Sequence, residues 1–328
     1  MLKLRLATRG SPLALLQTEL VASLLRDALP GITIEPLIVR TKGDISTEPL
    51  DRIGGQGIFV SEVQQAVRDG FADIGIHSAK DLTSNKTHGL IIGATPQRAD
   101  HRDALVGSTL DGLPVGGVVA TGSPRRRAQL ANLRPDLSFV ELRGNMRTRV
   151  DMASAKRVDA VVVATAALQR LGWTTSITEI LEPILMLPQA GQGIIAIECR
   201  EDDGEVQEVL KLVDDPLTHR LLDAERAVLA ALGGSCSVPV GAWAQSVGEL
   251  DLELHALVAS GDGRIVIRAT KIGSDPDRLG VELAHYLLAD CGGSRIEGFE
   301  RGYGTHSSSA DDSKKLGSLD GFIGDQRS

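Results

Sequence analysis

A dense group of arginines marks the middle of the chain. The segment from Ser123 to Arg149 holds seven Arg against one Asp and one Glu, although the whole chain of 328 residues has a net charge of −8. Ser123 followed by Pro124 predicts the start of a helix, which puts Arg125 and Arg126 in its first turn, where cations oppose the helix dipole. An anion is therefore expected to compensate them, and the planar guanidinium suits carboxylates.

Two more arginines are expected at the same edge. Arg143 follows a predicted strand and Arg149 lies one helical turn beyond, so both project at the carboxyl end of strands, where α/β sheets bind ligands. The alternative is a solvated basic helix face. For Arg127, Arg134 and Arg147 taken singly, that alternative is the favoured interpretation.

Lys80 and Asp81 directly follow a short buried strand at 72–77 and are expected at the mouth of a sheet as well. Asp81 could stabilise a cationic intermediate or handle a proton, and Lys80 could bind a second anion. Spacing alone leaves an ordinary ion pair equally open.

The cysteines point to a thiol that acts alone. Cys199, Cys236 and Cys291 are odd in number and form no C-x-x-C pair, which argues against a disulfide framework and against a zinc site. Cys236 lies in the glycine-rich stretch LGGSCSVPVG, which predicts a loop and makes it a candidate nucleophile or attachment point. The other two, in a strand and at a helix end, are expected to be structural.

Two glycine-rich stretches lack the context for nucleotide binding. The segment 191–196 fits a dinucleotide pattern, but a strand rather than a helix is expected to follow it. The stretch RIGGQGIFV has no Gly-Lys-Ser/Thr ending, so we expect a mobile lid that contains Gly54, Gly55 and Gly57.

The elements that must position these groups alternate between strands and helices. Ser11 and Pro12 start an amphipathic helix that ends before Pro30-Gly31, and strands at 32–41 and 72–77 enclose another helix, which predicts a parallel α/β unit. A second such unit is expected, with strands at 117–120, 138–142 and 159–164.

The strand-like stretch 194–200 indicates that the chain crosses back into the first unit, and two crossings imply a hinge. A small α+β unit follows, with a helix at 218–232, strands at 250–260 and 264–270 joined through Gly261-Asp262-Gly263, and a helix at 276–291. The expected domains are 1–94 plus about 194–213, 98–190, and 216–298, with a disordered tail at 301–328.

Composition excludes several classes of partner. An acidic chain with 3% aromatic residues lacks the positive field and the stacking platforms of nucleic-acid-binding proteins. Its apolar stretches are too short to span a bilayer and its first residues do not resemble a signal peptide, so a cytoplasmic protein without membrane contact is expected.

Seven segments, in order from Leu6 to about Gly292, resemble the porphobilinogen deaminase (hydroxymethylbilane synthase) family. They are ATRGSPLAL, GGQGIFV, HSAKD, the doubled arginine after TGSP, LRGNMRTR, LPQAGQGIIAIECR and GGSCSVPVG. The resemblance implies two α/β domains like those of type II periplasmic binding proteins, with a hinge and a cleft, plus a small α+β C-terminal domain that carries the cysteine.

The activity implied is that of a transferase in porphyrin and haem biosynthesis. The family joins four porphobilinogen molecules into linear hydroxymethylbilane with release of four ammonia, on a dipyrromethane primer held by a cysteine thioether. A monomer without metal is expected, with porphobilinogen as its small-molecule partner.

The resemblance also assigns roles to residues. Cys236 would carry the primer, and Asp81, beside Lys80, would support protonation of the leaving amine and stabilise the azafulvene cation. The acetate and propionate arms would be bound by Arg9, Ser11, Lys80, Thr121, Ser123, Arg125, Arg126, Arg143, Asn145, Arg149 and Arg170.

The chain departs from the commoner family pattern without losing a catalytic group. The departures are Gln56 for lysine, Leu82-Thr83 for Val-Pro, Pro124 for Leu, Arg147 for Gly and Ser235 for Gly. Two other functions remain as alternatives: a two-lobed binding module for a polycarboxylate with an inert Cys236, and a cysteine hydrolase with His219 or His255 as base, although neither histidine has a recognisable flanking motif.

Overall fold

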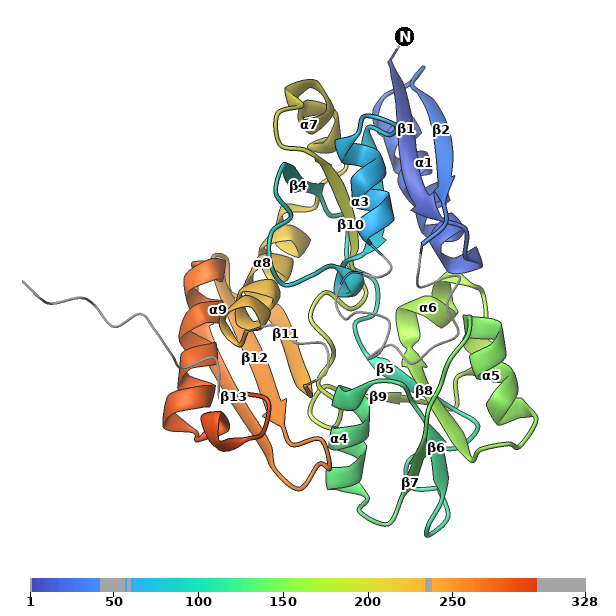
Figure 1. Ribbon diagram of the computed structural model, residues 1–328, viewed down its shortest axis with the longest axis vertical. Coiled ribbons are helices and arrows are strands. Elements are labelled where there is room, and N and C mark those ends of the chain that lie inside the picture. The colour runs from blue at the N-terminus through green and yellow to red at the C-terminus, as the bar shows by residue number, and fades with distance from the viewer. Residues whose placement is uncertain (1, 42–56, 58–59, 234–237, 300–328) are drawn as a thin grey trace, which may run out of the picture.

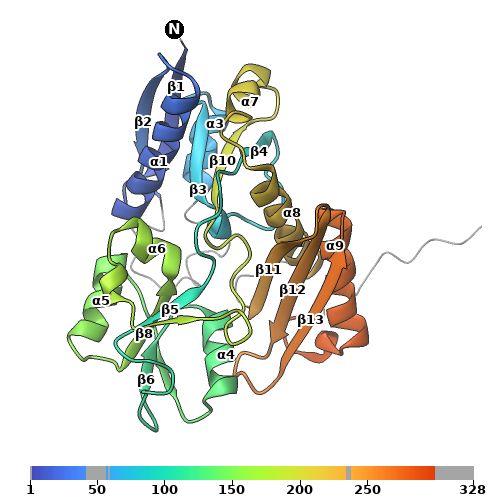
Figure 2. The same cartoon turned by 180° about the vertical axis from the view of Figure 1, so that it is seen from behind.

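Three separate β-sheets organise the protein in the computed structural model, which describes residues 2–41, 57, 60–233 and 238–299 (Figure 1). Figures 1 and 2 show two sheets flanked by helices, one above the other, with the third sheet and its two helices at their side. No helix in these described ranges is long and apolar enough to cross a membrane.

The first sheet has the strand order β2-β1-β3-β10-β4. Its strands are β1 (Lys3–Arg9), β2 (Thr33–Val39), β3 (Ile74–Ser78), β4 (Leu90–Ala94) and β10 (Ile195–Arg200). The strand predicted at 194–200 therefore does return to the first sheet. It pairs antiparallel with β3 and β4, however, whereas β1 pairs parallel with β2 and β3, so the sheet is mixed. The reversal arises because β10 enters from the second sheet rather than over a crossover helix.

Side-chain alternation along β1 explains why helices cover both faces of this sheet. Leu4 and Leu6 pack in one cluster with Val21 and Leu25 of α1 (Pro12–Ala28). The same cluster includes side chains of α7 (Gly204–Leu210). Ala7 packs on the other face with α3 (Ser61–Arg68). A period of two thus gives a strand that is buried on both faces.

The second sheet repeats this plan with the order β7-β6-β8-β5-β9. Its strands are β5 (Asp103–Val106), β6 (Val118–Ala120), β7 (Ser138–Val140), β8 (Ala160–Ala164) and β9 (Glu179–Leu181). Again the fourth strand, β5, comes from the other half of the molecule and runs antiparallel to both neighbours. Strands β5 and β9 were not expected from the sequence, and they are only four and three residues long.

Helices also cover both faces of the second sheet. Leu130 of α4 (Pro124–Leu133) packs on one face, and Val150 of α5 (Met146–Ser154) with Leu168 of α6 (Thr165–Arg170) packs on the other. The matching strand orders, each with a reversed strand in fourth place, confirm the predicted pair of α/β units with two crossings of the chain between them.

The third sheet is an antiparallel meander of β11 (Val240–Val247), β12 (Asp251–Ala259) and β13 (Val266–Gly273). Alternate apolar residues of β12, including Leu252, Leu254 and Ala256, form one core with α8 (Pro216–Ala231) and α9 (Pro276–His285). The predicted small α+β unit is confirmed, and the predicted last helix continues beyond α9 as a π-helix to Asp290.

Candidate active site

Lys80 and Asp81 lie in a 3₁₀ turn, Ala79–Asp81, that ends β3 as predicted. The backbone carbonyl of Lys80 accepts a hydrogen bond from Gln189 Nε2 at 3.0 Å, and its Nζ donates to Gln192 Oε1 at 3.3 Å. Burial lowers the pKa of Lys80 to about 8, and the positive charge of Arg126 contributes. The Asp81 side chain is exposed. The turn thus pairs a partly buried amine, whose pKa is lowered, with an accessible carboxylate.

Asp103 is the anion that compensates the two arginines in the first turn of α4. Its Oδ2 lies 2.8 Å from Arg125 Nη2 and its Oδ1 lies 2.7 Å from Arg126 Nη2. All three residues are buried, with Asp103 fully so. Burial alone would raise the pKa of the Asp103 carboxyl, but the two guanidinium groups outweigh it and hold this pKa far below its usual range. The alternative of a solvated helix face is therefore wrong for these two arginines.

The remaining donors of the pair are largely held by backbone carbonyls. Arg125 Nη1 donates to the Leu187 carbonyl at 2.5 Å and Arg126 Nη1 donates to the Val162 carbonyl at 3.0 Å. The buried Arg125 Nε has no hydrogen-bond partner among the described residues. The pair thus forms a rigid positive wall rather than two mobile arms.

Arg149 brings a second helix to the same place. Burial lowers its pKa, and the charges that act on it most strongly include Arg126, Asp81 and Arg9, which belong to three other elements. Its Nε donates to the Gly144 carbonyl at 2.9 Å. We call the seven residues that this network joins the junction cluster: Arg9, Lys80, Asp81, Asp103, Arg125, Arg126 and Arg149.

Three helices begin beside the junction cluster, each capped by a predicted site residue. Ser11 accepts from Ala14 N at the start of α1, Ser123 from Arg126 N at the start of α4, and Asn145 from Thr148 N at the start of α5. Thr121 Oγ1 accepts from the Ser123 backbone N–H. The capping hydroxyls keep an O–H donor available, and helix N-termini attract anions, so these positions add to the positive arginines.

Arg143 and Arg170 lie at the borders of this region. Arg143 Nε is 3.6 Å from Glu141 Oε1, and its side chain is about one-third exposed. Arg170 Nη2 donates to the Gly193 carbonyl at 2.8 Å, and burial lowers its pKa to about 10. Arg170 therefore joins α6 to the segment that leads into β10.

Gln192 is a central residue that no sequence pattern indicated. Its side chain is fully buried, accepts from Lys80, and donates through Nε2 to Asp103 Oδ1 at 2.9 Å and to the His101 carbonyl at 2.8 Å. The strand β10 follows it, which confirms that 191–196 is not a dinucleotide-binding turn. The partners of Gln192 come from distant parts of the chain, so only the three-dimensional crossing of the strands reveals its place.

Several predicted residues lie outside the described part of the chain or outside the junction cluster. Cys236, Gly54 and Gly55 are not among the described residues, whereas Gly57 is and has a φ of 84°. Arg127, Arg134 and Arg147 contact Phe139, Asp136 and Asp151.

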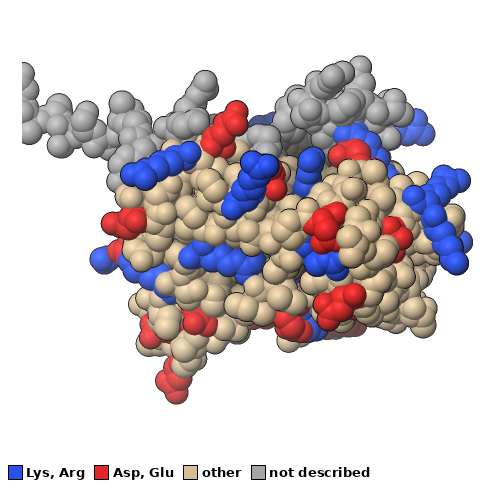
Figure 3. Space-filling view, turned by 90° about the horizontal axis from the view of Figure 1, so that it is seen from below, with Lys and Arg blue, Asp and Glu red and all other residues tan. Residues whose placement is uncertain are grey.

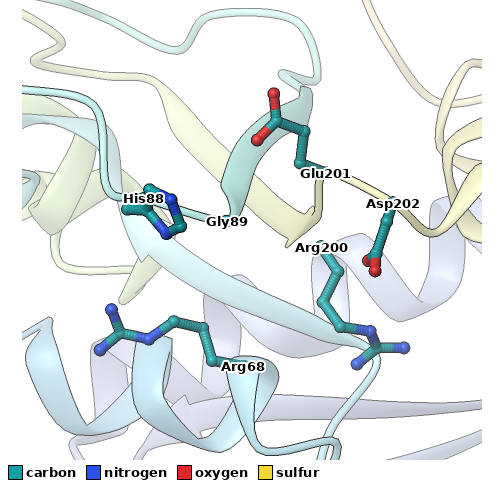
Figure 4. Close-up of a pocket in the computed structure, with 6 residues that line it drawn as sticks. All are labelled: Arg68, His88, Gly89, Arg200, Glu201 and Asp202. Atoms are coloured by element: carbon teal, nitrogen blue, oxygen red, sulfur yellow. The ribbon is translucent and has the colours of Figure 1, made fainter.

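A hollow of the described surface lies away from the junction cluster. A hollow of about 500 Å³ is lined by Arg68, His88, Gly89, Arg200, Glu201 and Asp202 (Figure 4). It lies at the end of β10 away from Ile195, the residue that pairs with Ser78 next to the 3₁₀ turn. Arg200 there donates to two backbone carbonyls and to Asp203. On the face shown in Figure 3, basic and acidic side chains are interspersed, so the excess positive charge is not an outer patch of that face.

Known proteins resemble this chain over most of its length. Residues 4–208 match the family model "Porphobilinogen deaminase, dipyromethane cofactor binding domain", and residues 220–289 match "Porphobilinogen deaminase, C-terminal domain". The curated porphobilinogen deaminase of Roseiflexus castenholzii is 46% identical over 299 residues, which are 89% of this chain and 98% of that protein. That of Syntrophus aciditrophicus is 41% identical, with coverage of 89% and 97%.

Among solved structures, the chain is similar to the methionine-binding protein MetQ. It has a TM-score of 0.41 and 12% identity, with 71% of this chain and 96% of that chain covered.

Proposed function

Because the chain belongs to the porphobilinogen deaminase family, we propose that its junction cluster is where it assembles the linear tetrapyrrole. The enzyme is a transferase of tetrapyrrole biosynthesis that joins four porphobilinogen molecules with release of four ammonia on a dipyrromethane primer. The residues of the cluster would divide three tasks among them: binding carboxylates, holding the primer and stabilising positive charge.

One observation supports this assignment above the others: four cationic side chains converge in a protein of net charge −8. Lys80, Arg125, Arg126 and Arg149 act on one another electrostatically, with Asp81 and Asp103 as counter-charges. Each pyrrole of the substrate carries an acetate and a propionate group, so a growing chain accumulates negative charge. A fixed concentration of cations is what such a ligand requires.

The residues at the cluster fit a dipyrromethane group. Its carboxylates match the cations, and the unpartnered Arg125 Nε together with the capping hydroxyls of Ser11 and Ser123 supplies further donors. When bound, the primer supplies the pyrrole carbon to which the first substrate is joined. We propose that Cys236 holds it by a thioether. Cys199 is unsuited because it is fully buried and burial raises the pKa of its thiol to about 11.

Asp81 is proposed as the residue that acts on the reacting atoms. Its exposed carboxylate can accept hydrogen bonds from pyrrole N–H groups and stabilise the positive charge that develops on the substrate as ammonia departs. Lys80, held by Gln192, is proposed to bind a carboxylate and to keep the site's proton balance beside Asp81.

The other predicted residues are proposed to bind substrate carboxylates in two ways. Arg125 and Arg126 would act as a fixed positive wall because Asp103 and backbone carbonyls hold their guanidinium groups. Direct contacts are proposed for Arg9, Ser11, Lys80, Thr121, Ser123, Arg143, Asn145, Arg149 and Arg170. The lid of Gly54, Gly55 and Gly57 is proposed to cover them.

We also propose the domain division expected from the sequence: 1–94 with about 194–213, 98–190, and 216–298, followed by a tail at 301–328. The three sheets support it, since each falls within one of these units. A cytoplasmic location is proposed because the attachment reaction needs a free Cys236 thiol, which a reducing compartment preserves. A monomer is proposed from the family resemblance alone.

The attachment site is tested by intact mass. Wild-type protein from cells that supply porphobilinogen should exceed the sequence mass by two linked pyrroles after denaturation and should give colour with an aldehyde reagent. Cys236→Ser should have the bare mass, while the matched control Cys199→Ser keeps the adduct. A bare mass for the wild type would reject the attachment and favour the polycarboxylate-binding alternative.

A further inference from the structure

An arginine of the third sheet contacts the second α/β unit. Arg268 of β13 lies at the surface, yet its guanidinium donates to the Leu185 carbonyl at 3.0 Å, to the Pro183 carbonyl at 3.4 Å and to the Ile184 carbonyl. Its Nη2 also donates to Gln129 Oε1 at 2.9 Å. The side chain thus holds both helix α4 and the segment that follows β9.

Gln129 connects Arg268, through Leu187, to Arg125 of the junction cluster. Its amide is buried, and its Oε1 accepts from Leu187 N at 2.8 Å while its Nε2 donates to the Leu187 carbonyl at 3.0 Å. The same carbonyl accepts the 2.5 Å hydrogen bond from Arg125 Nη1. A continuous hydrogen-bonded line therefore runs from Arg268 through Gln129 and Leu187 to Arg125.

We propose that Arg268 is a positioning residue, which fixes Gln129 and the 183–187 segment so that Arg125 keeps its place in the carboxylate-binding wall. This inference rests on the proposed function of the junction cluster. It assigns the third sheet a part in substrate binding.

The reason lies in how a carboxylate site loses affinity. A guanidinium group that must face a bound anion has to be held within about 0.5 Å of its productive position. Without Arg268, Gln129 Oε1 loses its charged donor and three consecutive carbonyls lose theirs. The 183–187 segment can then shift, and the Leu187 carbonyl with it, which releases one of the acceptors that hold Arg125.

A neighbouring contact offers a matched control. Asn132, also on α4, donates through Nδ2 to the carbonyl of Gly263 at 3.0 Å, so it too joins α4 to the turn between β12 and β13 (Figure 2). It makes no hydrogen bond to Gln129, Leu187 or Arg125 among the interactions of the described residues. Asn132→Ala therefore weakens the docking of the two units without touching the line to Arg125.

The test compares steady-state kinetics of Arg268→Ala, Gln129→Met, their combination and Asn132→Ala, each first shown by mass to carry the pyrrole adduct. Arg268→Ala should raise the KM for porphobilinogen about five- to tenfold, within the range of one lost ordinary hydrogen bond because the effect on Arg125 is indirect, with kcat within about twofold. The double variant should match Gln129→Met alone, because both changes cut one line. Arg268→Lys should recover part of the KM, and Asn132→Ala should leave it unchanged.

Three outcomes decide between a positioning role and simple docking. Equal KM values for Arg268→Ala and wild type, or multiplicative effects in the double variant, would overturn the positioning role. A KM increase for Asn132→Ala as large as that for Arg268→Ala would assign the effect to docking in general and overturn it too. Arg125→Leu is measured alongside: if it alone behaves as wild type, the proposed role of the wall itself fails.

Discussion

The Nζ atom of Lys80 lies 3.3 Å from Oε1 of Gln192, although 112 residues separate the two along the chain. The other end of the same amide donates to Asp103, the counter-ion of Arg125 and Arg126. The turn that ends β3 and the arginines of α4 therefore share one hydrogen-bonded network. A change of charge at Lys80 is therefore expected to change the electrostatic potential at Arg125 and Arg126 as well.

This network predicts a pH dependence of substrate binding. Burial and Arg126 lower the pKa of Lys80 to about 8, so the ammonium loses its proton as the pH rises through this value. The KM for porphobilinogen should rise above pH 8. Carboxylates of a bound primer would raise the pKa of Lys80 and so shift this rise to higher pH. Lys80→Arg keeps its charge, so its KM profile should stay flat from pH 7 to 10.

The protein should become more stable over the same pH range in which substrate binding weakens, so the two effects can be told apart. Below pH 8 the amine is charged in the folded and in the unfolded chain, and the cost of burying that charge is fully present. As the pH rises from about 8 to the ordinary lysine value, this cost disappears, so Lys80 itself makes the protein more stable. The rise in KM could instead come from unfolding. A melting temperature that falls as KM rises, by the same amount in wild type and in Lys80→Arg, would contradict the assignment of the KM change to Lys80.

Local rules predicted the elements well where they depend on neighbouring residues. The caps Ser11 and Ser123 begin α1 and α4 as expected, because a side-chain oxygen followed by a helical periodicity determines a helix start. The short strands β5 and β9 were missed. They are too short to show a period, and their place in the sheet is decided by the pairing of β5 with β8 and β9.

The sequence indicated the charged residues of the junction cluster other than Asp103, but not which of them contact one another. An anion near Arg125 and Arg126 was expected, and the expectation was that a ligand supplies it. The structure places Asp103 there, and this residue comes from β5, a strand that no local pattern revealed. Partners brought together by strands that cross between sheets cannot be inferred from spacing along one chain.

Asp103 should matter more for stability than any surface acid. Asp103→Asn leaves two buried guanidinium groups without their counter-charge, which typically costs about 3–5 kcal/mol in free energy of unfolding. Asp136→Asn is the control, because Asp136 pairs with Arg134 at 2.8 Å where both are partly exposed, and such pairs contribute about 1 kcal/mol or less. Denaturant titration of the two variants checks this, and equal losses would contradict the structural role of Asp103.

Two glycines of one turn should respond oppositely to alanine. Gly263 has a φ of 75°, and a Cβ there would lie 2.3 Å from the Ala128 carbonyl, whereas at Gly261 nothing lies within 4 Å. Gly263→Ala should therefore lower the free energy of unfolding by about 1–3 kcal/mol through backbone strain and overpacking against α4. Gly261→Ala should be neutral or slightly stabilising. Thermal melting of both variants checks this, and equal melting temperatures would show that the turn does not dock tightly on α4.

Asp81 should be needed for chemistry more than for assembly of the site. Its carboxylate is exposed beside the partly buried Lys80, in position to stabilise positive charge that develops only as ammonia leaves. Asp81→Asn keeps the size and loses the charge, so it should retain the pyrrole adduct and turn over about a hundredfold or more slowly, the scale of losing one preorganised electrostatic partner. Asp81→Glu should retain more activity than Asp81→Asn. The measurement is single-turnover ammonia release from primed enzyme at saturating porphobilinogen, and a wild-type rate for Asp81→Asn would remove this residue from the mechanism.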